Sequence, residues 1–204
     1  LDADVKNATY SDKFGERFPD RFLENFIAEQ NMLGAAAGVA ACGKIPFVAT
    51  FAAFFTRAYD FIRMAAISQS NIKLVGTHVG VSIGEDGPSQ MGLEDLAMMS
   101  TQPGVTVLYP SDGVSMYKLM ESATAHKGMV YLRAGRPKTP VIYGADETFK
   151  IGGSKVLRQS AADQLTIVAA GVTLFEALKA HDQLKAAGIA TRVVDLYSIV
   201  PVDQ

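Results

Sequence analysis

The stretch "IPFVATFAAFFTRAYDFIRMAAISQSNIKLVGT", residues 45–77, decides the fold class. It begins with a short run rich in β-formers at 45–51 and ends with a second one at 71–77. Between them, apolar residues recur at helical spacing over residues 52–70. Two short strands joined by one helix are typical of a parallel βαβ unit with a right-handed crossover. The stretch therefore predicts a parallel, twisted α/β sheet flanked by helices.

The same alternation continues on both sides of this unit. Upstream, "RFLENFI" at 21–27 is expected to form a strand, and "EQNMLGAAAGVAA" a helix that ends at Gly43. Downstream, further alternating strands and helices are predicted at 93–102 (helix), 105–112 (strand), 114–128 (helix) and 129–135 (strand). This order places the first 140 residues in one α/β domain.

A second α/β domain is predicted to begin after a break in the pattern. Proline, glycine and charged residues gather at 135–154, and no periodicity is present there. Beyond the break, residues 165–198 form a β-α-β pattern. We therefore divide the chain into a domain at 1–140 and, at 141–204, a linker with the beginning of a second domain. The chain starts at a strand-like residue and stops soon after a strand, so we expect a fragment.

Composition excludes several classes of protein. The 204 residues carry a net charge of −2, which gives no electrostatic footprint for nucleic acid. The single cysteine, Cys42, excludes an internal disulfide framework and a cysteine-rich metal site, and we expect it to be a small core residue. No apolar run reaches the ~18 residues of a membrane span, and no secretory leader is recognisable. These features favour a reducing, cytoplasmic setting.

Glu29 stands out in "FIAEQNMLGAAAG", residues 26–38. It lies between an apolar run and a small-residue segment, and no basic residue occurs in the stretch. One interpretation is a helix N-terminal carboxylate favoured by the helix dipole. The other is a desolvated carboxylate held ready for proton exchange with a ligand nitrogen. Spacing alone leaves both open.

The segment after the strand at 71–77 carries a dense set of polar side chains. Ligands of open α/β sheets bind beyond the carboxyl ends of the strands, where this segment begins. Its glycines allow an irregular backbone that turns polar groups toward a ligand, although a solvated loop is the plain alternative. A metal site is a poor rival, because no recurrent zinc spacing occurs. The polar residues are His78, Glu85, Asp86, Ser89 and Gln90.

Two aromatic residues and one arginine complete the candidates at this edge. Phe51 and Phe54 lie at a strand-to-helix junction, where a ring stacks readily on a planar ligand, whereas helical spacing usually indicates core. Arg136 follows the last strand of the first domain. It is interpreted either as an anion ligand or as an ordinary surface arginine.

Taken together, several motifs resemble the transketolase family across essentially the whole chain. They are "IAEQNM", "TFAAFFTRAYDFIRMAAISQSNI", "THVGVSIGEDGPSQMGLEDLAMM", "YPSDG" and "AGVTLFEALKAH". The glutamine of "GEDGPSQ" resembles the animal-type branch. The resemblance implies a thiamine diphosphate-binding, pyrimidine-type domain followed by the start of the C-terminal domain. It also implies transfer of a two-carbon ketol unit between sugar phosphates, in the pentose phosphate pathway.

The resemblance implies roles for individual residues toward the cofactor. Glu29 would exchange a proton with a ring nitrogen of the aminopyrimidine of thiamine diphosphate. Phe54 would stack on that ring, with Phe51 lining the same pocket. Gln90 would lie near the pyrimidine.

The resemblance also implies sugar-phosphate ligands. Asp86 and Asp4 match acids near the sugar hydroxyls, and His78 and Arg136 match ligands of its phosphate, where charged donors are needed. One residue departs from the family, because Ala8 stands where serine often serves as a phosphate ligand. Thr9 or Asn7 could compensate, and otherwise phosphate anchoring is weaker.

A segment resembling the family's "GDG…N" motif, which holds Mg²⁺ and the cofactor diphosphate, does not occur in these 204 residues. The resemblance places that segment in an N-terminal domain or subunit, with the cofactor between two subunits of a homodimer-type assembly. We therefore expect weak cofactor binding by this chain alone. The small-residue helix "GAAAGVAA" would suit either a partner interface or tight internal packing.

Two rival functions remain at this level. A 1-deoxyxylulose-5-phosphate synthase-like enzyme shares the glutamate and a "DGP" loop, but its use of pyruvate does not require the histidine-led loop. A noncatalytic transketolase-like assembly module is the rival from another class. Ala8 and the missing diphosphate half favour it, whereas Glu29, Phe54, His78 and Asp86 argue against it.

Overall fold

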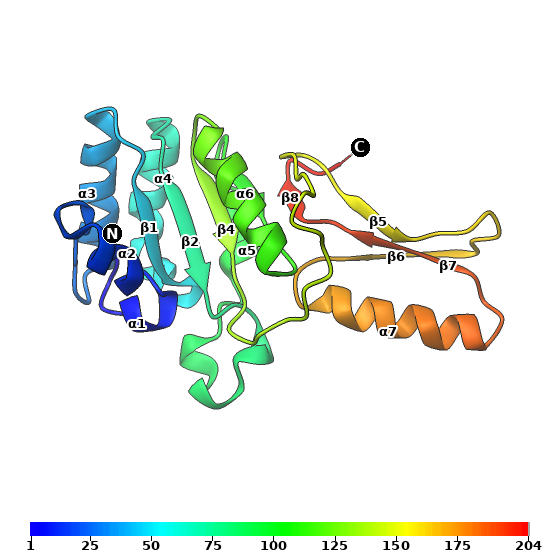
Figure 1. Ribbon diagram of the computed structural model, residues 1–204. Helices are drawn as coiled ribbons and strands as arrows, with labels where there is room; N and C mark the ends of the chain where they lie inside the picture. The colour runs from blue at the N-terminus through cyan, green and yellow to red at the C-terminus, as the bar shows by residue number, and fades with distance from the viewer. Residues whose placement is uncertain (204) are drawn as a thin grey trace.

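The computed structural model describes residues 1–203 and contains two sheets (Figure 1). The first sheet has the strand order β1-β2-β4-β3-β8. Its first four strands are parallel, and β8 is antiparallel to β3. The strands of this sheet are β1 Phe47–Phe51, β2 Lys73–Thr77, β3 Thr106–Leu108, β4 Val130–Arg133 and β8 Ser198–Val200.

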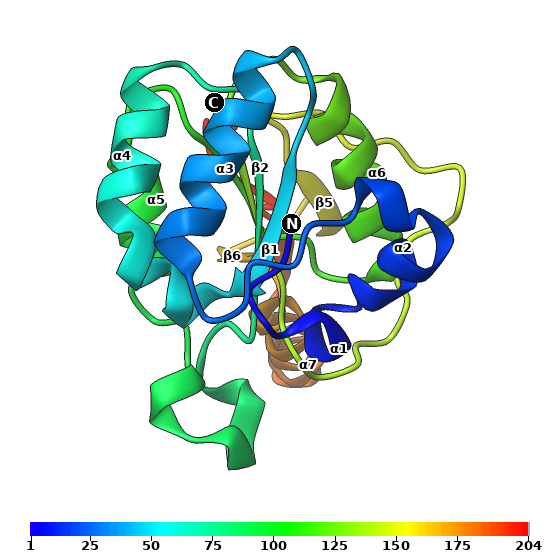
Figure 2. The ribbon, with the colours of Figure 1, turned by 90° about the vertical axis from the view of Figure 1, so that its left-hand side faces the viewer.

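Helices cover both faces of the first sheet (Figures 1 and 2). One face packs against α3, α4 and α5 through a core that includes Met32, Ile62 and Met99. The other face packs against α6 and the linker, where Leu119 meets Tyr143 and Phe149. The helices of this domain are α1 Lys6–Thr9, α2 Asp12–Arg17, α3 Glu29–Ala41, α4 Tyr59–Ile67, α5 Asp95–Ser100 and α6 Gly113–Ala125. Both faces are buried, as a parallel sheet requires.

The second sheet is smaller and has the order β5-β7-β6. Its strands β5 Lys155–Arg158, β6 Leu165–Ala169 and β7 Thr191–Asp195 are covered by helix α7 Thr173–Ala186. β6 and β7 are parallel, which confirms the predicted β-α-β unit, and the sequence reasoning missed β5, which is antiparallel to β7. The last strand, β8, returns to the first sheet and pairs with β3, which joins the two parts of the chain.

The prediction of a strand at 21–27 was wrong. A short 3₁₀ helix, η1 Pro19–Arg21, precedes an extended segment whose only ladder contact is an isolated bridge between Asp2 and Glu24. Phe26 then takes a left-handed backbone (φ 53°), which ends any extension toward α3. The apolar run therefore has no neighbouring strand with which to pair.

Two smaller expectations also need correction. The helical segment at 52–67 begins as a 3₁₀ helix, η2 Ala52–Ala58, and becomes α-helical only at α4. Cys42 is exposed rather than a core residue, because α3 ends at Ala41 and the chain turns into solvent there. The remaining 3₁₀ segments, η3 Val81–Asp86 and η4 Pro88–Gln90, lie in the loop after β2.

Candidate active site

The parallel strands point their carboxyl ends toward one edge of the first sheet, and the candidate residues gather there. Phe51 ends β1, and His78 follows β2 directly. Glu29 begins α3, which leads into β1. Figure 2 shows the segment after β2, in green, projecting from this edge of the sheet. The location agrees with the rule that open α/β sheets bind ligands beyond the carboxyl ends of their strands.

Glu29 is buried at the N-terminus of α3, with 1% of its surface exposed. The N-cap residue Ala28 offers no side-chain cap, and an acidic residue in the first turn, such as Glu29, is favoured by the positive end of the helix dipole. No basic residue is near Glu29 along the chain, but the fold brings one from η2: Nη1 of Arg57 donates to Oε1 at 2.5 Å. Oε2 accepts no hydrogen bond from any residue of the described range 1–203.

The aromatic residues form a continuous stack that is linked to this carboxylate through Arg57. The rings of Phe51 and Phe54 lie 5.0 Å apart between centroids and 19° from parallel. The imidazole of His78 stacks on the ring of Phe51, with centroids 3.7 Å apart and planes 15° from parallel. The guanidinium of Arg57 lies over Phe54, 4.5 Å from its centroid. Phe54, Phe51 and His78 thus contact one another directly. Glu29 is connected to them through Arg57, which sequence reasoning missed.

The loop from residue 78 to residue 92 holds its shape through backbone contacts at its base. Gly92 accepts from Gly80 N and donates to the carbonyl of His78. His78 itself has a left-handed backbone (φ 59°), which is uncommon for a non-glycine residue and clusters at functional sites. Gly84 and Gly87 also have positive φ, and only glycine takes such conformations without strain. The predicted use of glycine in this loop is therefore visible in its backbone.

A charged cluster extends from His78 along the loop. Oδ2 of Asp86 lies 3.8 Å from Nε2 of His78 and 3.2 Å from Nε of Arg136. Nη1 of Arg136 also contacts Glu85 at 2.7 Å and donates to the carbonyl of Ile83. Burial lowers the pKa of His78, while Asp86 raises it and Arg136 lowers it. The imidazole is therefore mainly neutral at pH 7, and Arg136 supplies the positive charge of this cluster.

The structure does not join Gln90 and Asp4 to the connected set. Gln90 is half-buried in η4, and its side chain accepts from Ser89. Asp4 is exposed near the carboxyl end of β1, because the preceding Asp2 bridges to Ala49. Its backbone is left-handed (φ 61°), like that of His78, and its N–H donates to Glu24. Within residues 1–203, neither side chain forms a hydrogen bond or an ion pair with Glu29, His78, Asp86 or Arg136.

Sequence reasoning also missed a buried clamp under the loop. Nε and Nη2 of Arg133 donate to the two carboxylate oxygens of Asp95 at 2.7 and 3.1 Å. Nη2 also reaches the carbonyl of Gly92 at 3.3 Å, and the guanidinium lies over Tyr109. The only signal was an arginine at the end of an apolar strand. The clamp links α5 and β4 to the base of the loop that carries His78.

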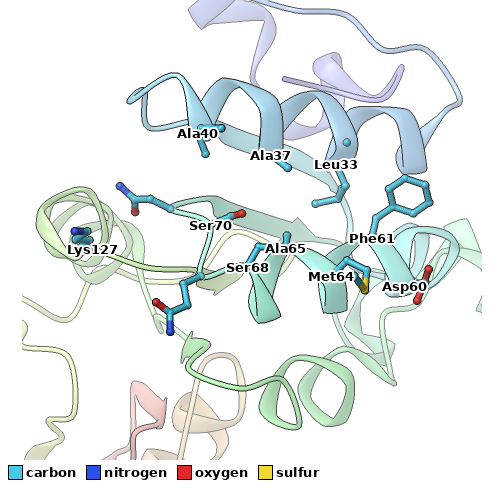
Figure 3. Close-up of a pocket in the computed structure, with 14 residues that line it drawn as sticks. Leu33, Ala37, Ala40, Asp60, Phe61, Met64, Ala65, Ser68, Ser70 and Lys127 are labelled. Atoms are coloured by element: carbon cyan, nitrogen blue, oxygen red, sulfur yellow. The ribbon is translucent and has the colours of Figure 1, made fainter.

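A groove of about 660 Å³ lies between α3 and α4, away from the candidate side chains (Figure 3). Leu33, Ala37, Phe61 and Met64 line it, with Lys127 at one end. The small residues of α3 thus face an open groove on this side.

Within residues 1–203, no group of three or more His, Cys, Asp or Glu side chains is arranged to hold a metal ion. In the same range, no helix is long and apolar enough to cross a membrane.

The fold and the site define an α/β protein with a buried glutamate and an aromatic stack at the ligand-binding edge of its sheet. Comparison with protein families makes this definition specific. Residues 1–141 match the model of the transketolase pyrimidine-binding domain, and residues 154–204 match that of the transketolase C-terminal domain. The chain belongs to the transketolase family.

Similar proteins support the same assignment over the whole chain. Transketolase-like protein 2 of Mus musculus is 57% identical over 204 residues, and transketolase of Homo sapiens is 54% identical over 205. The chain covers 32% and 33% of these relatives and so spans about a third of their length.

Solved structures agree with the fold. A chain described as a split gene transketolase, in an inactive β4 tetramer, matches with TM-score 0.88 and 40% identity. That match covers all of this chain and 66% of the other. A transketolase from Pichia stipitis in complex with sedoheptulose 7-phosphate matches with TM-score 0.87 and 25% identity, over 98% of this chain and 32% of the other.

Proposed function

We propose that this chain is the pyrimidine-binding and C-terminal part of a thiamine diphosphate-dependent transketolase. The proposed reaction transfers a two-carbon ketol unit from a ketose phosphate to an aldose phosphate, as in the pentose phosphate pathway. The observation that carries the proposal is the buried Glu29, linked through Arg57 to the stacked rings of Phe54 and Phe51. A carboxylate and an aromatic face are the two groups that an aminopyrimidine requires. The family membership of the chain supports the same reading.

The residues present fit the pyrimidine half of the cofactor. Glu29 has one oxygen, Oε2, without a hydrogen bond in the described range, so it can accept from a protonated ring nitrogen. Phe54 offers an aromatic surface under Arg57, the residue that also binds that carboxylate. When bound, thiamine diphosphate supplies the carbon nucleophile and electron sink of the reaction. In this proposal Glu29 holds and moves the proton at the ring nitrogen, Phe51 and Phe54 orient the ring, and Gln90 approaches it from the loop.

The charged cluster on the loop is the proposed sugar-phosphate end. Arg136 is partly exposed, so a phosphate can compete with Glu85 for its guanidinium. Neutral His78 donates one hydrogen bond, and Asp86 accepts from sugar hydroxyls. Asp4 would act as a second acid near the sugar, from the carboxyl end of β1. In this proposal Arg136 and His78 meet the phosphate, while Asp86, which contacts both of them in this structure, and Asp4 meet sugar hydroxyls.

The proposal requires a partner for the diphosphate half. An N-terminal domain or subunit would hold Mg²⁺ and the diphosphate, and the assembly would be of the homodimer type. In this proposal residues 1–140 form the complete pyrimidine-binding domain. The split gene transketolase that this chain resembles is described as an inactive β4 tetramer, which supports the need for a second component. The relatives are about three times longer than this chain, in agreement with an additional domain.

A donor-half assay on the full-length protein, or on the chain with its partner, tests the proposal. Thiamine diphosphate, Mg²⁺ and xylulose 5-phosphate are supplied, and release of aldose phosphate is compared with release of carbon dioxide from pyruvate. Aldose phosphate from the ketose is the expected result. Carbon dioxide from pyruvate would instead support the synthase-like enzyme. If cofactor binds but neither product forms, the noncatalytic module is the better description, and the relatives named transketolase-like make that outcome worth testing.

A further inference from the structure

Arg57 makes the only cation contact of the proposed catalytic glutamate within residues 1–203. Its side chain is 48% exposed, whereas that of Glu29 is 2% exposed, and Nη1 donates to Oε1 at 2.5 Å. Burying a carboxylate without a partner is costly, so the cofactor-free protein needs this contact. The guanidinium therefore satisfies one oxygen, Oε1, of the carboxylate that the proposed function assigns to the cofactor.

The same guanidinium also lies over the aromatic ring assigned to the cofactor. The guanidinium carbon of Arg57 lies 4.5 Å from the centroid of Phe54, within the range of a cation–π contact. Phe54 stacks in turn on Phe51, and Phe51 on His78. The stack thus runs from Arg57 through Phe54 and Phe51 to His78. The guanidinium covers the ring of Phe54, on which the proposed function places the aminopyrimidine.

A guanidinium and an aminopyrimidine share the relevant chemistry. Both are planar, both carry N–H groups that donate to a carboxylate, and both stack on an aromatic face. We propose that Arg57 is a placeholder for the aminopyrimidine: it binds Glu29 and covers Phe54 in the cofactor-free protein, and it rotates into solvent when the cofactor ring enters. This inference rests on the proposed function and adds to it a residue that competes for the cofactor site.

The surroundings of Arg57 allow such an exchange. Glu29 is the only described residue with which its guanidinium forms a hydrogen bond or an ion pair. About half of the side chain already faces solvent, and its long stem can turn without moving η2. Glu29 and Phe54 are held by α3 and η2 and keep their places. The exchange therefore replaces one planar donor by another and requires no change of fold.

The test measures ligand binding rather than turnover. In the full-length protein with its diphosphate-binding domain, Kd is measured by calorimetry for 4-amino-5-hydroxymethyl-2-methylpyrimidine, the pyrimidine half of the cofactor. Inorganic diphosphate with Mg²⁺ is titrated in parallel. The variants are Arg57→Gln, Arg57→Lys and, as a control, Arg63→Gln, which changes an exposed arginine of the following helix. Thermal unfolding of each cofactor-free variant verifies that it is folded.

If Arg57 is a placeholder, the Kd for the pyrimidine should be about 3–10-fold lower in Arg57→Gln than in the wild type, because the ligand no longer has to break a partly exposed ion pair. Arg57→Lys should gain less, because it keeps the charge but loses the planar group. Diphosphate binding and Arg63→Gln should remain at wild-type values. Equal or weaker pyrimidine binding by Arg57→Gln would overturn the placeholder while leaving the proposed function intact. Absence of pyrimidine binding in wild type and variants alike would overturn the proposed function itself.

Discussion

The imidazole of His78 stacks on the ring of Phe51, with centroids 3.7 Å apart and planes 15° from parallel. The contact joins the end of β1 to the start of the loop after β2, two neighbouring parallel strands. It couples the proposed cofactor side of the site, at Phe51, to the proposed sugar-phosphate side, at Asp86 and Arg136. The protonation state of His78, which depends on Asp86 and Arg136, therefore also sets the charge of the ring that stacks on Phe51.

Replacement of Asp86 by asparagine should lower the pKa of His78 further. Burial already lowers this pKa, and the carboxylate of Asp86, 3.8 Å away, opposes that shift. Without the carboxylate, desolvation and Arg136 both act in the same direction. An NMR titration of the imidazole protons measures the change. Glu85→Gln is the control, because Glu85 does not contribute to the shift of His78; an unchanged or higher pKa in Asp86→Asn would contradict the prediction.

Replacement of Glu29 by glutamine should lower turnover by about 10²–10⁴-fold and leave the fold intact. Glutamine has the same shape and still accepts from Arg57, so the N-terminus of α3 keeps its contact. The amide of glutamine does not ionise, so it cannot exchange a proton with a ring nitrogen as the carboxyl of Glu29 would. The donor-half reaction of the full-length protein, together with thermal unfolding, separates the two effects. Near-normal turnover in a folded Glu29→Gln protein would remove the proposed proton role.

Sequence and structure agree best where periodicity is strong. The unit at 45–77 appears as β1, η2–α4 and β2. The paths of β5 and β8 were not predictable in this way, because an antiparallel edge strand depends on which distant strand offers a free edge.

The candidate site shows the same limit. The positions of Phe51 and His78 follow from strand ends, which sequence patterns locate well. The partners of buried charges do not, because a charge pairs with whatever the fold brings near it. Arg57 reaches Glu29 across 28 positions, and Arg133 reaches Asp95 across 38. Local pattern carries no information about either pair.

Replacement of Ala8 by serine should lower the Michaelis constant for a phosphorylated donor. Ala8 lies in α1, and the hydroxyl of its neighbour Thr9 donates to the buried carboxylate of Asp2 at 2.6 Å. Thr9 is therefore already engaged and substitutes poorly for a serine at position 8. The Michaelis constants of wild type and Ala8→Ser are compared for one phosphorylated and one unphosphorylated ketose. An unchanged constant for the phosphorylated donor would refute the anchoring hypothesis.

Replacement of Arg133 by lysine should loosen the loop at 78–92. Lysine keeps the charge but cannot span both oxygens of Asp95 and the carbonyl of Gly92. Hydrogen–deuterium exchange in peptides from this loop should accelerate. Lys73→Met is the control: Lys73 is another buried cation, but it lies at the opposite edge of the sheet and donates to Asn71 and two carbonyls there. Equal loop exchange in both variants, at matched global stability, would contradict a specific role for the clamp.

Asp195, at the end of β7, links the two parts of the chain from a fully buried position. Its carboxylate accepts from Ser111 Oγ at 3.0 Å and from the hydroxyl of Tyr143 at 2.6 Å. Burial raises the pKa of Asp195 to about 6, and the nearby Asp112 acts in the same direction, while the two hydrogen bonds and Lys155 oppose it. The folded chain therefore favours the protonated carboxyl more than the unfolded chain does.

The contribution of Asp195 to stability should accordingly decrease as the pH rises. It is fully present below the unfolded pKa near 4 and is lost as the pH passes through the folded pKa of about 6. Asparagine does not titrate, so the free energy of unfolding of wild type relative to Asp195→Asn should fall by roughly 2–3 kcal/mol between pH 4 and pH 7. Urea unfolding at steps of one pH unit measures the difference. Asp163→Asn provides a control of opposite sign. Desolvation raises the pKa of Asp163, but the contacts with Ser160 and Arg192 together outweigh it and lower the pKa, so the contribution of Asp163 is lost as the pH falls. A pH-independent difference for Asp195→Asn would show that the buried carboxyl keeps the same protonation state in the folded and unfolded chains.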